Sequence, residues 1–311
     1  MLAAIHLLGR LALIRPRFAA GYLIVLTVTI LAILAPLIAP YSPTEADSAN
    51  FLQPPSAAHL FGTDNVGMDI FSRAIYAPRI DLTIAVLGTL LSALLGGSIG
   101  ALAGYYSTGH GIRVWLSFAV MRAADVIQAF PVFVFAIALV ASLGQSIQTV
   151  VLAIAFVNAP IYLRLMRSQV LSIRSMRYVE ASQVNGLSDF QTIVRHVIPN
   201  AMAPVLAQLS INVGWGILLT AALSFVGAGV RAPTPEWGSM IAMGFQNVVT
   251  GQWWPSMFPG VMLAITVFGF SLVGASIEAL ADPAKRRQLL SDARQRDRKK
   301  AAVEQPSLER I

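Results

Sequence analysis

Long apolar runs alternate with polar segments along the whole chain. Most of the runs hold about 20 residues with almost no charge, which is the length that an α-helix needs to cross a lipid bilayer. The pattern therefore predicts an all-α, polytopic membrane protein with six transmembrane helices and little room for a soluble domain. The six runs cover residues 18–38, 82–104, 115–143, 147–165, 202–223 and 257–280.

Two of the runs contain residues that predict how their helices pack or bend. Gly96, Gly100 and Gly104 lie four residues apart in the second run, a spacing that lets two helix backbones approach closely in lipid. The third run contains Pro131, which lacks a backbone donor and therefore predicts a kink in that helix.

The third run also contains an ionisable pair, Arg122 and Asp125. Residues three apart share one face of a helix and can form an ion pair, and a charge inside a bilayer generally faces protein or water. Two interpretations stay open. The pair is a gate or a contact for a neighbouring segment, or it is a structural ion pair near the membrane interface. We favour the structural ion pair.

The net charge is +7, and the positive residues gather on alternate polar segments. Lys and Arg favour the cytosolic side of a membrane protein, so topology accounts for the charge without a nucleic-acid partner. Residues 1–17, 166–200 and 285–311 are basic and are predicted to be cytosolic, the last of them as a disordered tail. The segments 40–81 and 229–254 carry few basic residues and are predicted to be extracytoplasmic.

Several common chemistries lack the residues that they need. The chain has no Cys, and its four His residues are scattered, so we predict neither disulfides nor a metal site. No phosphate-binding loop of the form GxxxxGK[ST] occurs, so the chain is not expected to bind or hydrolyse ATP. No Ser-His-Asp set and no paired carboxylates at helix spacing occur in the runs, which predicts that the chain is not an enzyme.

The polar segment 178–200 lies between the fourth and fifth runs. The residues before Gly186 favour a helix, Gly186 permits a sharp turn or a positive φ, and Ser188 suits the N-cap of a second short helix over 187–197. Pro199 suits the start of the next membrane helix. We therefore predict a helix–turn–helix that projects from the membrane as a rigid knob. Its partly apolar contact face would contain Leu171, Met176, Val179 and Val184.

This spacing resembles the EAA loop of ATP-binding-cassette (ABC) importer permeases, in which Glu-Ala-Ala precedes a Gly and then Ile-x-Leu-Pro. The residues that carry the match are Glu180, Ala181, Ser182, Gly186, Ile198 and Pro199. Ser182 replaces the second Ala, His196 stands at the Ile position, and Ile198 replaces Leu. The resemblance implies that the segment docks into a cleft of a cytosolic ATPase and passes its movement to the membrane helices. The alternative is a plain connecting loop.

Two further segments resemble the peptide/nickel branch of these permeases. Residues 59–73 resemble its GTDxxGRDxxSR signature, with Met68 in place of Arg, and residues 223–238 resemble LSFLGLG…PPTPxWG. The second segment is expected to be re-entrant or tightly folded on the extracytoplasmic side. The residues that match are Gly62, Asp64, Gly67, Asp69, Arg73, Gly227, Gly229, Pro235, Trp237 and Gly238.

The residues around the sixth run give two further expectations. Trp237, Trp253 and Trp254 are candidates for anchors at the membrane interface, where tryptophan is enriched. At the end of the run, Ala275 and Glu278 replace an Asp and an Arg of the branch pattern. This chain is therefore expected to lack a polar contact that its relatives make there.

The resemblance implies a type I ABC importer permease with the MetI-like fold over residues 18–284. It also implies a bacterial cytoplasmic (inner) membrane protein that forms a heterodimer with a second, related permease. Two cytosolic ATPase subunits and an extracytoplasmic solute-binding protein would complete the importer. ATP and Mg²⁺ would be bound by the ATPase subunits, with no cofactor on this chain. The expected cargo is a peptide or a related small solute such as a nickel chelate.

Two other classes of function remain open at this point. A secondary transporter driven by an ion gradient usually carries more ionisable groups near the middle of the membrane than Arg122 and Asp125. A non-transporting membrane scaffold or receptor would need no ATPase at all. Uptake that requires ATP would exclude both classes.

Overall fold

The structure is a computed structural model that describes residues 16–108, 110–281 and 291. The predictions for residues 1–15 and for nearly all of the 285–311 tail lie outside the described residues. Within the described residues the chain is helical, and a single isolated bridge joins Thr63 to Asp69. The elements are α2 (Pro16–Ile38), η1 (Ser48–Asn50), α3 (Ile70–Tyr105), α4 (Ile112–Ala129), α5 (Val132–Leu143), α6 (Ile147–Ile173), α7 (Arg177–Val184), α8 (Asp189–Thr192), η2 (Ile193–Val197), α9 (Ile198–Phe225), α10 (Trp237–Val248) and α11 (Trp254–Ala281).

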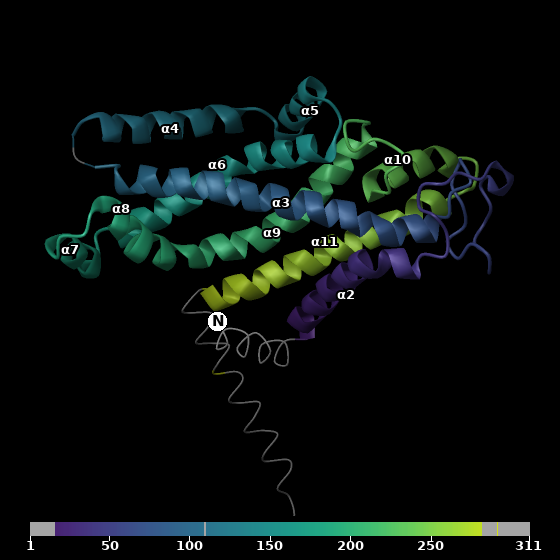
Figure 1. The fold of residues 1–311 in the computed structure, drawn as a ribbon, viewed down its shortest axis with the longest axis horizontal. Coiled ribbons are helices and arrows are strands. Elements are labelled where there is room, and N and C mark those ends of the chain that lie inside the picture. Colours follow the sequence, from purple (N-terminus) through teal and green to yellow (C-terminus); the bar gives the residue numbers. More distant parts are fainter. Residues whose placement is uncertain (1–15, 109, 282–290, 292–311) are drawn as a thin grey trace, which may run out of the picture.

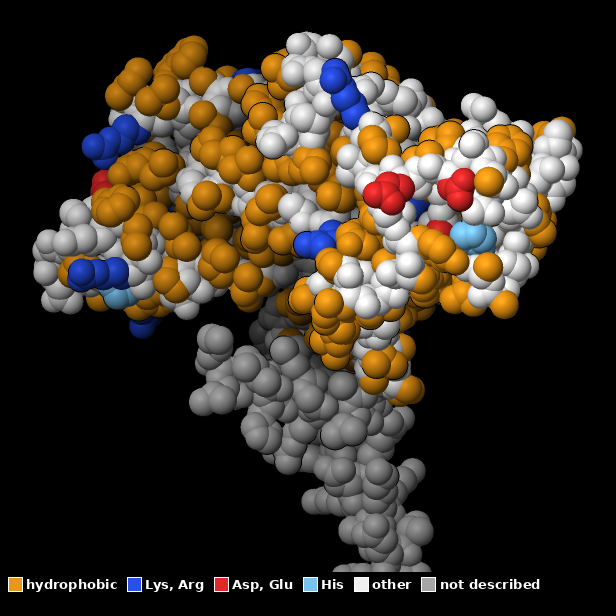
Figure 2. Space-filling view, turned by 45° about the vertical axis from the view of Figure 1, so that its right-hand side comes forward, with side chains coloured by type: hydrophobic (Ala, Val, Ile, Leu, Met, Phe, Trp, Pro, Cys, Tyr) orange, Lys and Arg blue, Asp and Glu red, His pale blue; other side chains and the backbone are white. Residues whose placement is uncertain are grey.

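The long helices lie side by side, with α2 at one flank and α4 at the other (Figure 1). Helices α7 and α8 lie at one end of the bundle, which we call the α7 end. Helix α10 and the loop between α2 and α3 lie at the opposite end, which we call the α10 end. Broad apolar areas cover the face seen in Figure 2, as expected of a surface that meets lipid.

Five helices of the described chain are long and apolar enough to cross a membrane, and α4 with α5 adds a sixth crossing if the bent pair counts as one. The most extensive helix contact joins α3 to α6. A Cβ at Gly96 or Gly100 would collide with the carbonyl oxygens of Ala159 and Leu163 on α6. The close packing predicted from the glycine spacing is therefore confirmed.

The third crossing is broken rather than kinked. Helices α4 and α5 meet at an angle of 92°, so the prediction of one bent helix underestimated the change of direction. Phe130 adopts an extended conformation, as the residue before a proline tends to do, and Pro131 then serves as the N-cap of α5. The inner face of α5 packs through Ala136 and Val140 in the cluster that contains α6 residues.

The second short helix predicted over 187–197 is not a separate element. Helices α8, η2 and α9 run as one helix from Asp189 to Phe225. The η2 turn is π-helical, with the Ile198 N–H donating to the Ile193 carbonyl oxygen. A wider turn at this point suits Pro199, which cannot donate and would crowd the preceding turn of a regular α-helix. Pro199 therefore lies in the first turn of α9, as predicted, but the helical path that contains it already begins at Asp189.

Candidate functional site

Gly186 turns the chain between α7 and α8. Its φ is +82°, in the left-handed region that L side chains rarely adopt, and a Cβ there would meet no atom within 4 Å. The backbone conformation therefore requires glycine, whereas the available space does not. Ser188 then caps α8 in a capping box, in which its Oγ accepts from the Gln191 N–H and the Gln191 side chain accepts from the Ser188 N–H. The predicted turn and cap are both confirmed.

One face of α7 packs inwards. Val179 and Ser182 are buried, and Val179 joins a cluster formed by side chains of α3, α6 and α9. The Ser182 Oγ donates to the Val179 carbonyl oxygen at 2.7 Å and lies 3.3 Å from the Thr192 Oγ1 of α8. Ser182 therefore fits the inner surface of the turn between the two helices, so it does not form part of the outer surface.

The other face of the 178–200 segment is exposed. Glu180 and Ala181 are exposed, as are the large apolar side chains of Val184, Phe190 and Val194, with exposed fractions of 88%, 71% and 45%. Exposed apolar groups gathered on a polar end of a membrane protein indicate an interaction site. Phe190 and Val194 were not identified from the sequence. Of the predicted contact face, Met176 and Val184 are exposed, Leu171 is half-buried and Val179 is buried.

A polar cluster ties this segment to the ends of α3 and α4. Asp189 of α8 accepts from the Tyr105 hydroxyl at 3.1 Å and forms an ion pair with Arg113 at 3.2 Å. Gln183 of α7 donates to the same hydroxyl at 2.7 Å. Arg174 donates to backbone oxygens at the end of α3, at 3.0 and 3.3 Å. The segment is thus joined to α3 and α4 as well as to α6 and α9, which continue from it.

The same cluster contains Tyr106, the residue that follows α3. The Arg113 guanidinium lies 4.8 Å from the centre of its ring, a cation–π geometry. Burial raises the pKa of the Tyr106 phenol, and the nearby Asp189 carboxylate raises it further, so the phenol stays neutral at neutral pH. Asp189, Arg113 and Arg174 therefore carry the charges of this cluster.

The predicted ion pair between Arg122 and Asp125 is present at 3.1 Å. The Arg164 guanidinium of α6 donates to the other carboxylate oxygen of Asp125 at 2.6 Å, so Asp125 links α4 to α6. All three side chains are partly exposed, and exposed pairs contribute only about 0–1 kcal/mol. The network therefore fixes the position of α4 more than it stabilises the fold. A gating role for it stays a prediction.

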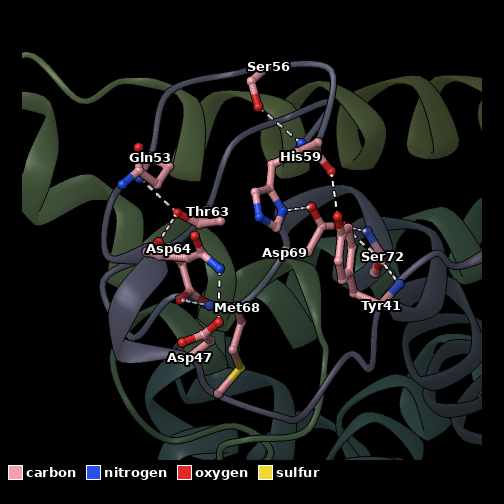
Figure 3. Close-up of polar contacts among 12 residues, drawn as sticks. Tyr41, Asp47, Gln53, Ser56, His59, Thr63, Asp64, Met68, Asp69 and Ser72 are labelled. Carbon is pink, nitrogen blue, oxygen red and sulfur yellow. Dashed lines mark hydrogen bonds and ion pairs between the residues drawn. The ribbon is translucent and has the colours of Figure 1, made fainter.

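Residues 41–73 and 224–239 meet at the α10 end, and we call this region the polar framework. Asp69 begins α3: one carboxylate oxygen accepts from the Ser72 N–H and hydroxyl, both at 2.7 Å, and the other lies 2.9 Å from the His59 Nδ1 (Figure 3). His59, Asp69 and Ser72 are all buried. Asp69 therefore caps the helix and fixes the loop on it at the same time.

Arg73 joins the two halves of the polar framework. Its guanidinium donates to the Pro43 carbonyl oxygen at 2.7 Å and to the Pro233 carbonyl oxygen at 3.2 Å. Its Nε lies 3.7 Å from the Asp64 carboxylate, and its Nη1 contacts the Met68 sulfur. Arg73 is 1% exposed. The Met that replaces Arg in the signature thus packs against the buried guanidinium.

The glycines of both signatures are needed either because their φ is positive or because another part of the chain leaves no room for a Cβ. Gly62, Gly67 and Gly227 have positive φ values, and a Cβ at Gly229 or Gly238 would collide with Ser224 or with the Ala221 backbone. The expected tight folding of residues 223–238 is confirmed in this sense. The matched signature residues build the framework, so their match to the family pattern reflects folding at this end of the molecule.

The prediction that three tryptophans anchor at the membrane interface was wrong for two of them. Trp237 and Trp254 are buried, and their indole N–H groups donate to the carbonyl oxygens of Ala74 and Thr63 at 3.1 and 3.2 Å. A buried indole needs such an acceptor, and the framework supplies one to each. Trp253 is about half exposed. Pro235 is also buried, directly before the N-cap of α10.

These features define a multi-pass helical membrane protein with a folded polar framework at one end and an exposed helix–turn–helix at the other. The described residues include no cluster of three or more His, Asp or Glu that could hold a metal. The sequence matches two families: "Binding-protein-dependent transport system inner membrane component" over residues 96–287, and "N-terminal TM domain of oligopeptide transport permease C" over residues 15–55. The chain belongs to the family of binding-protein-dependent transport system inner membrane components.

Curated relatives share much of the chain. It is 38% identical to the "Dipeptide transport system permease protein DppC" of Alkalihalophilus pseudofirmus, covering 85% of this chain and 84% of that protein. It is also 38% identical to the "Probable D,D-dipeptide transport system permease protein DdpC" of Escherichia coli K12, covering 86% and 88%. The family membership expected from the three motifs is confirmed, and with it a transport subunit of the inner membrane rather than an enzyme.

A solved structure shares the fold. The permease chain of the inward-facing MetNI methionine ABC transporter aligns with a TM-score of 0.54 and 18% sequence identity, covering 68% of this chain and 96% of that chain. At that identity the likeness shows the fold alone. The prediction of an all-α permease fold of the MetI type is therefore confirmed.

Proposed function

We propose that the chain forms, together with a second related permease, the translocation path of an ATP-driven importer of small peptides. The two relatives described above carry the names of dipeptide transport permeases, and this chain matches them over most of their length. Their names support peptides as the cargo. A solute-binding protein would deliver the peptide, and two cytosolic ATPase subunits would bind the ATP and Mg²⁺. No cofactor is required on this chain.

The observation that carries the proposal is the exposed face of the 178–200 segment. The Glu180 side chain makes no hydrogen bond or ion pair with the described residues, and it shares the segment with the exposed side chains of Val184 and Phe190. This surface suits docking to an ATPase cleft, because it combines apolar area with a free carboxylate. Asp189 then connects the docked surface to α3 and α4.

The proposed cycle follows from that connection. ATP draws the ATPase pair together, the pair moves the 178–200 segments of both permeases, and the helices change from inward-open to outward-open. The binding protein releases the peptide into the open path, and hydrolysis of ATP returns the helices to the inward-open state. ATP and the loaded binding protein can shift this equilibrium only by the difference in their affinity for the two states.

The proposed orientation places the α7 end and both chain termini in the cytosol, and the polar framework outside. The chain has no Cys, so a single introduced Cys can be labelled selectively. Val184→Cys should react with a membrane-impermeant thiol reagent only after the membrane is opened, whereas Leu60→Cys, which is exposed in the polar framework, should react in intact cells. The reverse result would contradict the orientation.

The transport itself is tested in proteoliposomes that contain both permeases and both ATPases. Peptide uptake should require ATP and the binding protein, and an ion gradient alone should give none. Uptake with an ion gradient in the absence of ATP would overturn the proposal. The absence of uptake under every condition, from a complex that hydrolyses ATP, would also overturn it.

A further inference from the structure

A cavity of about 330 Å³ lies at the break between α4 and α5. Gln128, near the end of α4, and Val132, at the start of α5, line it from the two sides of the break. Asn158 of α6 and Asn212 and Trp215 of α9 line it from across the bundle. The cavity therefore brings three carboxamide side chains from three helices together, and no ionisable side chain lines it.

The two asparagines of this cavity are buried, and the amide nitrogen of Asn158 lacks an acceptor. Asn158 is 1% exposed, and its Nδ2 has no hydrogen-bond partner. The Asn212 oxygen accepts from the Gln208 amide at 2.8 Å, and the Asn212 side chain also contacts the Tyr162 hydroxyl, which does not line the cavity. A buried polar group without a partner costs about 1–3 kcal/mol. Such a group on Asn158, beside a cavity that two further carboxamides line, indicates a site that a ligand completes.

The site lies beside the break between α4 and α5. A helix end leaves carbonyl or N–H groups without intrahelical partners, and the turn at Phe130 and Pro131 interrupts the third crossing within its apolar run. Irregular backbone at membrane depth is tolerated where it lines a cavity. Substrate sites of several transporter folds are built at such discontinuous helices.

We propose that Gln128, Asn158 and Asn212 form a contact site for the backbone of a peptide in transit, an inference that rests on the proposed function. A carboxamide offers a donor and an acceptor, so it can pair with a peptide bond in either direction. The absence of charge from the lining lets the site accept peptides of different side-chain charge. Val132, Phe135 and Trp215 supply apolar walls, and the volume is at the small end of ligand pockets, enough for one or two residues.

The first experiment replaces each asparagine by the similarly sized apolar residue, as Asn158→Leu and Asn212→Leu, in the complete importer. Gln148→Leu is the matched control, because Gln148 is an exposed amide on α6 outside the cavity. Uptake of a dipeptide is compared with uptake of its depsipeptide analogue, in which an ester replaces the amide, so that the carbonyl oxygen becomes a weaker acceptor for an asparagine N–H and one donor is lost. The same binding protein is used throughout, so its own preference cancels between variants.

The wild type and Gln148→Leu should show the same preference for the peptide over the depsipeptide. That preference should fall about fivefold in both asparagine variants, which is the effect of about one hydrogen bond. A loss of packing alone would lower uptake of both compounds equally. An unchanged preference in both asparagine variants would overturn the inference while leaving the proposed function in place. Failure of the wild type to transport either compound would instead count against the proposed function.

A second experiment decides the question if the leucine variants do not assemble. In Gln128→Cys the thiol stands at a half-buried position of the cavity, and the native chain has no Cys to compete. In the complete complex, loaded binding protein and a non-hydrolysable ATP analogue should slow labelling by a water-soluble methanethiosulfonate about fivefold. The same proteins without peptide should not slow it. Equal rates with and without peptide, or no labelling because the second permease fills the cavity, would overturn the inference.

Discussion

The polar framework and the 178–200 segment both carry sequence signatures, yet their side chains are used in opposite ways. In the framework, Arg73, Asp69 and Trp237 are buried and bound to other parts of this chain. In the 178–200 segment, Glu180 and Ala181 are exposed. The framework signature makes its contacts within the chain, whereas much of the other signature faces outwards.

The difference teaches how to interpret a motif in a membrane protein. A motif whose polar atoms are all bonded internally specifies the fold, and changing it should lower stability first. A motif that leaves polar and apolar groups exposed on a rigid support is available to a partner, and changing it should lower coupled function first. Stability and transport measured together therefore separate the two regions.

The largest loss of stability is expected from Arg73→Leu. Removal of the guanidinium leaves Asp64 without its cation and the Pro43 and Pro233 carbonyl oxygens without their donor. Breaking a buried ion pair by removing one partner typically costs about 3–5 kcal/mol. Thermal unfolding of the detergent-solubilised complex should show a clear fall in Tm, or the subunit should fail to accumulate. Arg79→Leu, at an exposed position of the same helix, is the control, and equal effects of both variants would contradict the framework role.

A smaller loss is expected from Gly238→Ala in α10. An added Cβ would collide with the backbone of Ala221 on α9, and overpacking of this kind costs about 1–3 kcal/mol. Gly260→Ala in α11 is the matched control, because a Cβ at Gly260 meets no atom within 4 Å. The difference in Tm between the two variants measures the close contact. A Gly238→Ala variant as stable as Gly260→Ala would show that the helices can separate at no cost.

Gly186→Val is expected to cost about 1–2 kcal/mol, because it forces a β-branched residue into a left-handed conformation. The cost is local to the turn, so insertion of the subunit should persist while ATP-dependent uptake falls. Gly186→Asn tests the cause, since asparagine tolerates positive φ and the site has open space. Asn should restore most of the uptake. Wild-type transport by Gly186→Val in proteoliposomes would refute the role of the turn.

The features that the sequence alone predicted are those set by local chemistry. The apolar runs predict the crossings, Gly186 predicts the turn, Ser188 predicts the cap, and the spacing of Gly96 and Gly100 predicts a close contact with another helix. Each depends on residues within a few positions of one another. Local propensity is sufficient for the turn and the cap because their neighbours along the chain are also their neighbours in space, whereas the partner of Gly96 and Gly100 comes from a distant part of the chain.

The features that the sequence did not predict depend on distant contacts. Arg164 meets Asp125 across 39 residues, and Trp237 finds its acceptor at Ala74 across 163 residues. A tryptophan near the end of a membrane run suits either an interface anchor or a buried position, and the acceptor decides between them. Likewise, Pro131 predicts a change of direction, but the 92° angle depends on where α5 packs.

The smallest effect on stability and the sharpest effect on function are expected together from Glu180→Lys. The side chain is exposed and makes no contact that the fold requires, so the stability should change by less than about 0.5 kcal/mol. Reversal of the charge should nevertheless weaken docking to the ATPase, because a lysine cannot accept the hydrogen bond or form the ion pair that the Glu180 carboxylate is proposed to make in the ATPase cleft. Co-purification of the ATPase and ATP-dependent uptake should both fall, while the Tm of the isolated permease pair stays unchanged. Glu180→Gln removes the charge but keeps the shape of the side chain, so its loss of ATPase co-purification and uptake should lie between those of the wild type and Glu180→Lys. If Glu180→Lys instead lowered the Tm and left uptake intact, Glu180 would stabilise the fold, as the residues of the polar framework do. The proposed contrast between the two regions would then be wrong.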